Sequence, residues 1–196
     1  MFKDFQQKKR NRFRKITNVA ITKTQKVFLE GFNEEQNIYI WERQKRLLSV
    51  AKEINLSREV GILMDIVTWE EWVILGKKNR IEMRDNLEAY LRFKQNRKNT
   101  LLFMHNHPNT STFSGKDFKT FCTNESLYMI IVVGNDGTVH VLYKTKNFDK
   151  ENALLLYYKL AMGKYANKRN NGMLAMKELL KRCNEIGLVY KRGGRD

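Results

Sequence analysis

The sequence of 196 residues is poor in cysteine and in long apolar stretches. Only Cys122 and Cys183 are present, which is too few for a disulfide framework. The longest apolar run, residues 127–133, is too short to cross a bilayer, and no secretory signal precedes it. These absences predict a soluble, cytoplasmic protein that makes no contact with a membrane. No pattern in the sequence specifies an oligomeric state.

Acidic residues are also scarce. The chain has 21 Asp and Glu against 37 Lys and Arg, which gives a formal net charge of +16 and a pI of about 9.9. Such an excess is typical of proteins that bind nucleic acid or another polyanion, although it also serves solubility alone. Charge by itself indicates no sequence specificity.

The basic surplus is dense in the N-terminal segment, residues 1–32. Phenylalanines at positions 2, 5 and 13 alternate with the basic residues there, and rings of this kind can stack on bases. We therefore expect an arm that orders on binding nucleic acid, with a disordered tail or a docking amphipathic helix as alternatives. The candidate contacts are Lys8, Lys9, Arg10, Arg12, Arg14 and Lys15.

Proline and histidine are rare, and they occur together. The only proline, Pro108, follows two of the three histidines, His105 and His107, and an apolar run at 100–104 precedes them. Residues two apart on a strand point to the same side, so both imidazoles should meet. Asp117, near the start of a predicted helix, would complete a set of three zinc ligands and leave one position open, as in catalytic zinc sites.

The same residues allow a structural interpretation. A lone His-x-His pair is usually a surface or core feature, and Ser114 with Asp117 could form only a variant capping box at a helix start. The two interpretations are compatible, because a capped helix start is a firm mount for a ligand.

The motif resembles a known family. The pattern His-x-His-Pro at 105–108, followed by Ser-x-x-Asp at 114–117, is similar to the JAMM signature of MPN/JAB-domain metalloproteases. The tetrapeptide His-Asn-His-Pro is most similar to that of RadC-like members carried by phages or mobile elements. The resemblance covers roughly residues 44–145, and the segment 59–64 is similar to the family strand that bears a glutamate.

The resemblance implies a fold and a set of roles. It implies an α+β, sandwich-like fold with a cytidine-deaminase-like mixed sheet flanked by helices. His105, His107 and Asp117 would bind Zn²⁺, Glu59 would deprotonate the attacking water, and Ser114 would stabilise the oxyanion. The reaction would be hydrolysis of an amide or isopeptide bond in a protein or peptide, ubiquitin-like tags included. The loop from His107 to Ser114 is one residue shorter than the commoner family pattern, which we attribute to a subfamily.

The chain is expected to divide into a basic arm (1–32), an MPN/JAB-like domain (33–147) and a helical extension (148–196). Hydrophobic periodicity and turn residues predict the individual elements. They are one helix or two from 33 to before 55, a hairpin of 59–67 and 72–77, a helix at 86–95, a helix at 117–124, a hairpin of 127–133 and 138–143, helices from 149 and at 171–186, and a frayed basic tip at 191–195.

Several alternatives remain open. Glu53, Glu70 and Glu71 compete with Glu59 for the role of base, and Glu59 is preferred because it opens an apolar strand. His140 is expected on an exposed strand face, while Cys122 is expected to be a packed helix residue rather than a ligand. The alternative function is a nucleic-acid-associated module of a phage or mobile element with a vestigial metal site. A third hypothesis is a basic packaging protein without catalysis.

Overall fold

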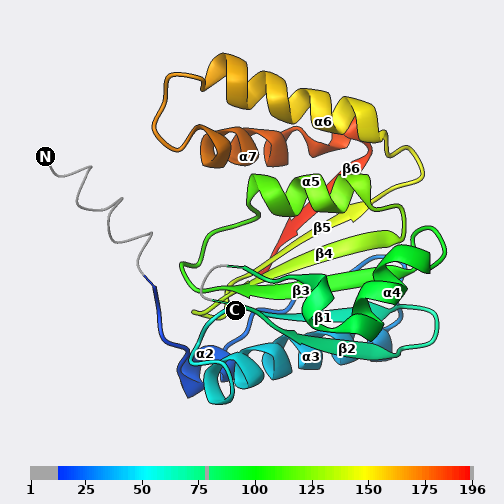
Figure 1. Cartoon of the computed structure of the whole chain (residues 1–196), viewed down its shortest axis with the longest axis vertical. Coiled ribbons are helices and arrows are strands. Elements are labelled where there is room, and N and C mark those ends of the chain that lie inside the picture. The colour runs from blue at the N-terminus through cyan, green and yellow to red at the C-terminus, as the bar shows by residue number, and fades with distance from the viewer. Residues whose placement is uncertain (1–12, 78–79, 195–196) are drawn as a thin grey trace, which may run out of the picture.

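The computed structural model describes residues 13–77 and 80–194. Its centre is a six-stranded mixed sheet in the order β2-β1-β3-β4-β5-β6, in which only β3 and β4 are parallel (Figure 1). The strands are β1 (Val60–Asp65), β2 (Glu71–Leu75), β3 (Leu101–His107), β4 (Leu127–Gly134), β5 (Val139–Lys144) and β6 (Leu188–Arg192). The predicted α+β class, a mixed sheet flanked by helices, is confirmed. Its finer likeness to an MPN-type sheet stays a prediction.

Helices cover both faces of the sheet (Figure 1). One face packs on α2 (Asn18–Thr22) and α3 (Glu34–Glu53), and the opposite face packs on α5 (Gly115–Thr123), beyond which lie α6 (Lys150–Lys159) and α7 (Asn171–Lys181). Helix α4 (Leu87–Gln95) lies beside β2. Two hydrophobic clusters result, one on each face. Because β3 and β4 are buried on both faces, their sequences are continuous apolar runs rather than alternating ones.

Most of the predicted elements are present. The segment from position 33 forms one helix, α3, whose start is closed by a capping box between Asn33 and Gln36. Both predicted hairpins form, β1 with β2 and β4 with β5. Among residues 13–77 and 80–194, no helix combines the length and the apolar composition that a membrane span requires.

The C-terminal prediction needs correction. Lys191 and Arg192 were expected in a frayed tip, but they belong to β6, which pairs antiparallel with β5. Gly187, at a φ of +69°, turns the chain from the 3-10 helix Cys183–Ile186 into this strand. Helix α7 and Leu188 share one cluster with α5, so the predicted extension packs into the same core as the central sheet.

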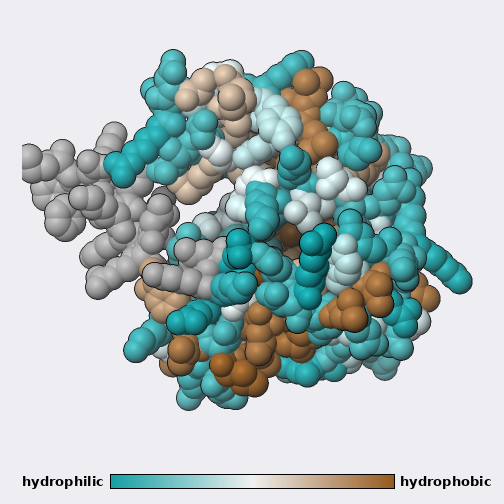
Figure 2. Space-filling view, viewed as in Figure 1, coloured by the Kyte–Doolittle hydropathy of each residue, from teal (hydrophilic) through white to brown (hydrophobic). Residues whose placement is uncertain are grey.

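The predicted basic arm is described only in part. Of its candidate contacts, Lys8, Lys9, Arg10 and Arg12 lie outside the described residues. Arg14 forms an ion pair with Asp136 and donates its backbone N–H to the Pro108 carbonyl at 2.8 Å. Helix α2 follows, capped by Thr17, and was not predicted. Hydrophilic side chains cover most of the face shown in Figure 2, while hydrophobic residues gather in its lower half.

Candidate metal centre

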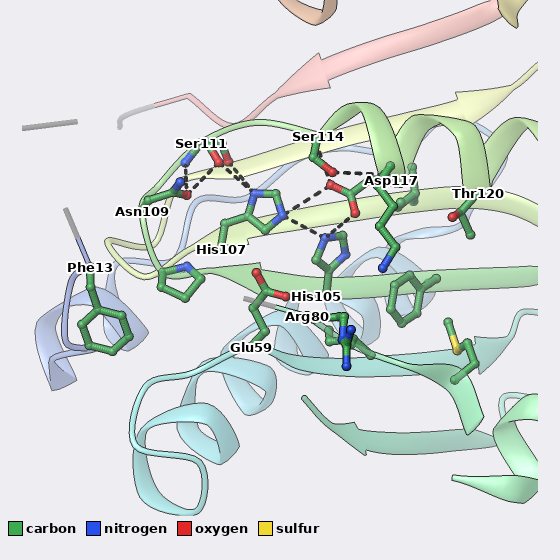
Figure 3. A pocket seen from close by; sticks show the side chains of 16 residues that line it. Phe13, Glu59, Arg80, His105, His107, Asn109, Ser111, Ser114, Asp117 and Thr120 are labelled. Carbon is green, nitrogen blue, oxygen red and sulfur yellow. Dashed lines mark hydrogen bonds and ion pairs between the residues drawn. The ribbon is translucent and has the colours of Figure 1, made fainter. Parts of the chain in front are cut away.

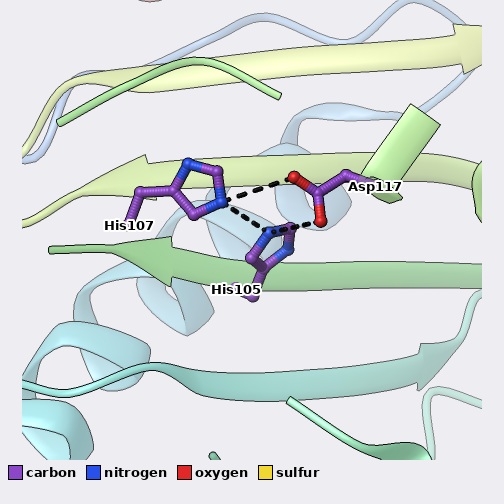
Figure 4. A group of neighbouring side chains, drawn as sticks. All are labelled: His105, His107 and Asp117. Carbon is purple, nitrogen blue, oxygen red and sulfur yellow. Dashed lines mark hydrogen bonds and ion pairs between the residues drawn. The ribbon is translucent and has the colours of Figure 1, made fainter. Parts of the chain in front are cut away.

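Strand β3 and the start of α5 bring three predicted ligands together (Figure 4). The strand continues through His107, so both imidazoles project from the same side of the sheet, and their Nε2 atoms lie 3.0 Å apart. The Asp117 carboxylate reaches them from the first turn of α5. Its Oδ1 lies 3.5 Å from His105 Nε2, and its Oδ2 lies 3.4 Å from His107 Nε2.

These distances fit a shared cation. Bonds of about 2.0 to 2.1 Å in a tetrahedral zinc site place neighbouring ligand atoms about 3.3 to 3.4 Å apart. The two Nε2 atoms lie 3.0 Å apart and approach different oxygens of Asp117, at 3.5 and 3.4 Å. With one ligand atom from each residue, the three atoms lie within 4.8 Å of one another. Two ring nitrogens that face each other this closely also need a proton or a cation between them. The buried triad of His105, His107 and Asp117 could therefore hold a metal ion.

Each ligand is oriented by its own neighbours. His107 Nδ1 lies 3.1 Å from the Ser111 carbonyl oxygen, which can only accept, so Nδ1 donates and the neutral ring presents a free Nε2 lone pair. His105 stacks on the Phe103 ring with centroids 5.2 Å apart. Its Nδ1 is buried, and the part of the chain described here offers it no hydrogen-bond partner.

Asp117 is fixed by the capping box that the sequence predicted. The Ser114 hydroxyl accepts the Asp117 backbone N–H at 3.1 Å, and Asp117 Oδ2 accepts the Ser114 backbone N–H at 2.7 Å. The capping-box interpretation of these two residues is therefore confirmed, and it is compatible with metal binding by Asp117. Both depend on one short helix start.

Electrostatics in the triad favour a carboxylate beside imidazole. Burial would raise the pKa of Asp117, but His105 and His107 hold it well below its ordinary value. Burial lowers the pKa of His105, and Asp117 offsets this effect only in part. For His107 burial acts in the same direction, yet Asp117, Glu59 and Ser111 outweigh it and raise the pKa. Asp117 is thus ionised at neutral pH, as a metal ligand requires.

Glu59 lies directly before β1 and faces the same pocket (Figure 3). The β1–β3 ladder pairs Gly61 with His105, so Glu59, two residues earlier, lies at the level of His107. Burial raises the pKa of Glu59 from 4.5 to about 7, with Asp117 adding to the shift. A carboxyl group with a pKa near 7 can take up and return a proton at neutral pH.

The competing glutamates lie elsewhere. Glu53 is exposed at the end of α3, and Glu70 is exposed before β2. Glu71 forms ion pairs with Arg43 and Arg46. None of the three lines the pocket.

Two further predictions concern His140 and Cys122. The expectation that His140 is exposed was wrong, because the side chain is 4% exposed and its Nδ1 lies 2.8 Å from the Tyr190 hydroxyl. The cause is β6, which the sequence pattern did not predict: it pairs with β5 and carries Tyr190, whose ring stacks on His140. Cys122 is buried in α5 as predicted.

The pocket has a volume of about 490 Å³, and sequence reasoning missed part of its wall. Phe13 was interpreted only as an aromatic residue of the arm, yet it lines the pocket (Figure 3). Arg80 and Lys116 place positive charge at the pocket, and an apolar part of the wall comes from Ile81, Met83, Phe103 and Ile130. These residues come from separate segments, so no local pattern could have joined them.

Comparisons of the chain with protein-family models, with curated proteins and with solved structures find no significant match. The fold and the site therefore define a structural class and a kind of site, but no family. The chain is an α+β protein with a six-stranded mixed sheet, and one face of that sheet carries a buried His-His-Asp cluster that could hold a metal ion.

Proposed function

We propose that this protein is a zinc-dependent peptidase or isopeptidase of the JAMM type. One observation carries the proposal: His105, His107 and Asp117 converge within 4.8 Å of one another in a pocket that also contains the half-buried carboxyl group of Glu59. The spacing of these residues resembles the JAMM signature, which supports the assignment independently of the geometry.

Two imidazole nitrogens and one carboxylate are a ligand set typical of hydrolytic zinc sites. In this proposal His105, His107 and Asp117 hold the cation. When bound, zinc polarises a carbonyl group and lowers the pKa of a water molecule from about 15.7 to near 7.

The protein's own groups would handle the protons and the developing charge. Glu59 would take the proton from the attacking water and return it to the leaving amine. The Ser114 hydroxyl accepts one hydrogen bond as helix cap, and its own O–H is left to donate to the oxyanion. A single donor of this kind contributes about 3 to 4 kcal/mol to transition-state stabilisation.

The substrate would be a protein or peptide with an amide or isopeptide bond. The pocket combines the polar centre with an apolar wall, which suits a side chain beside the scissile bond. Ubiquitin-like tags enter the proposal through the family resemblance alone.

Metal analysis and a pair of variants test the proposal. The purified protein should contain about one zinc per chain, and the double variant His105→Ala, His107→Ala should contain none. Glu59→Gln should keep its zinc, because Glu59 is not among the three ligands, and should lose at least about 10²-fold in peptidase rate.

Glu53→Gln is the matched control, since it removes an exposed glutamate outside the pocket and should leave both zinc and rate unchanged. A panel of isopeptide-linked and linear peptides provides the activity readout. Zinc bound without cleavage of any member would contradict the peptidase assignment, and absence of zinc would contradict the metal centre.

The net charge of +16 favours a second candidate, a nucleic-acid-associated module whose metal site is vestigial or serves another hydrolysis. This candidate predicts that the double histidine variant binds DNA as well as the wild type while no peptide is cleaved. If DNA binding is absent at moderate salt, only the peptidase proposal remains.

A further inference from the structure

Asn106 separates the two histidines in the sequence and is completely buried. Because side chains alternate along β3, Asn106 points to the opposite face from His105 and His107 and lies outside the pocket. A buried amide has two donors and one acceptor oxygen to satisfy, and its partners show what it holds in place.

The partners of Asn106 flank Glu59 on both sides. Its Oδ1 accepts the backbone N–H of Val60 at 2.7 Å, and its Nδ2 donates to the backbone carbonyl of Arg58 at 3.2 Å. The side chain thus binds the residue before Glu59 and the residue after it. Both contacts join positions more than 40 apart in the sequence, so they connect β3 to the beginning of β1.

Two more asparagines complete this arrangement. Asn55 Nδ2 donates to the Glu59 carbonyl at 2.8 Å. Asn135 Oδ1 accepts a second bond from Asn106 Nδ2 at 2.7 Å, while Asn135 Nδ2 donates to the Ser57 carbonyl at 3.0 Å. We call Asn55, Asn106 and Asn135 the asparagine clamp.

The clamp acts where the regular sheet ends. The β1–β3 ladder stops at the pair Gly61 and His105, and strand ends fray when nothing holds them. Beyond this pair, the side chain of Asn106 forms hydrogen bonds with the backbone of β1 and the residues before it, in place of further backbone hydrogen bonds from β3. The residue that holds the segment around Glu59 is therefore the residue between the two imidazoles.

We propose that Asn106 is a positioning residue that fixes the Glu59 segment relative to His105 and His107. Its effect on catalysis rests on the proposed function, whereas its effect on the position of Glu59 does not. The side chains of the clamp form no hydrogen bond with His105, His107 or Asp117, so metal binding and base positioning become separable properties.

The test compares Asn106→Ala with Asn124→Ala. Asn124 is a matched control, because it also joins two backbone groups, the Phe93 carbonyl at 2.8 Å and the Leu127 N–H at 3.0 Å, and it does not line the pocket. Asn55→Ala, at a half-buried position, loosens the clamp more gently and serves if Asn106→Ala does not fold. The readouts are zinc content, amide hydrogen exchange at Val60 and steady-state kinetics.

In Asn106→Ala the zinc content should stay at the wild-type level while the Val60 amide exchanges at least about tenfold faster. If peptidase activity is present, kcat should fall by about 10²-fold with little change in KM, as expected for a displacement of about 1 Å in a catalytic group. Asn124→Ala should change neither Val60 exchange nor kcat.

Unchanged Val60 exchange would overturn the proposal, and so would loss of zinc or an equal fall of kcat in Asn124→Ala. If the wild-type protein binds zinc and cleaves no peptide, the proposed function fails. In that case zinc content and Val60 exchange still decide whether Asn106 holds the Glu59 segment.

Discussion

Single residues at this site have more than one task. Ser114 accepts the Asp117 N–H as helix cap and lines the pocket as the proposed oxyanion donor. Asp117 accepts the Ser114 N–H and faces both imidazoles. A single substitution therefore changes stability and chemistry together, unless it is chosen to separate them.

Glycine and alanine at position 114 separate the two tasks of Ser114. Ser114→Ala should cost about 1 kcal/mol of stability, because an alanine N-cap accepts no hydrogen bond, whereas Ser114→Gly should cost only a few tenths. Both variants lack the hydroxyl, so both should lose a similar factor in kcat, about 10²-fold. Urea unfolding and kinetics on the two proteins check this. A fall of kcat that follows stability instead would exclude the hydroxyl from catalysis.

Glu59 should make the metal-free protein less stable as the pH rises. The folded state holds the Glu59 proton up to a pKa of about 7, while the unfolded state releases it near 4.5. Between these values the folded state binds more protons, so its stability falls with increasing pH. Because water screens this half-buried group, we expect a loss of about 1 to 2 kcal/mol rather than the full shift.

Glu59→Gln removes this pH effect. In the presence of a chelator, the variant should match the wild type near pH 4.5 and exceed it above pH 7. Urea unfolding at both pH values measures the difference, with Glu53→Gln as the exposed control. If the difference in unfolding free energy between the wild type and Glu59→Gln is the same at both pH values, the buried position of the carboxyl group is contradicted.

At the scale of elements, the site depends on the contact between β1 and β3. Gly61 in β1 pairs with His105, and a Cβ atom at Gly61 would lie 2.7 Å from Phe103 Cε2. The absence of a side chain there lets the Phe103 ring lie against β1 and stack on His105. Glycine is thus needed at position 61 for the close approach of the Phe103 ring that stacks on His105, and not for a turn.

Gly61→Ala should press Phe103 against His105. We expect a loss of about 1 to 3 kcal/mol of stability from overpacking, together with weaker zinc binding. Gly163→Ala is the control, because a Cβ atom there meets nothing within 4 Å. Urea unfolding and zinc titration of both variants provide the measurement. Zinc affinity equal to that of the control would mean that Phe103 does not orient His105.

At the scale of the whole molecule, the basic N-terminal residues before Phe13 can be tested separately from the fold. The described N-terminal residues are anchored, since the Ile16 N–H binds the Ser57 hydroxyl at 3.0 Å and the Arg14 carbonyl accepts from Asn135 at 2.7 Å. A deletion that tests nucleic-acid binding should therefore end before Phe13, which lines the pocket.

Deletion of residues 1–12 removes five of the basic residues, Lys3, Lys8, Lys9, Arg10 and Arg12. If all five contact phosphates, the slope of log K against log salt should fall by about 4 to 5. Binding to a DNA duplex at several salt concentrations measures it. Replacing the same five residues with glutamine separates charge from the stacking of Phe2 and Phe5. An unchanged slope would exclude this segment as a DNA contact.

Local patterns in the sequence determined most of the elements and the three residues that could hold a metal ion. His105 and His107 share a side because side chains alternate along a strand, and Ser114 with Asp117 form a helix start because their side chains bond to nearby backbone groups. These are interactions over two or three residues, so the order of residues is sufficient to predict them.

Only the tertiary structure decided what lies around the ligands. Tyr190 of β6 stacks on His140, Phe13 forms part of the pocket wall, and Asn106 binds the residues on either side of Glu59. Each of these arrangements joins residues more than 40 positions apart along the chain. Which of many distant partners meet depends on how the strands are ordered in the sheet and on which buried polar groups must be satisfied, and no local pattern contains that information.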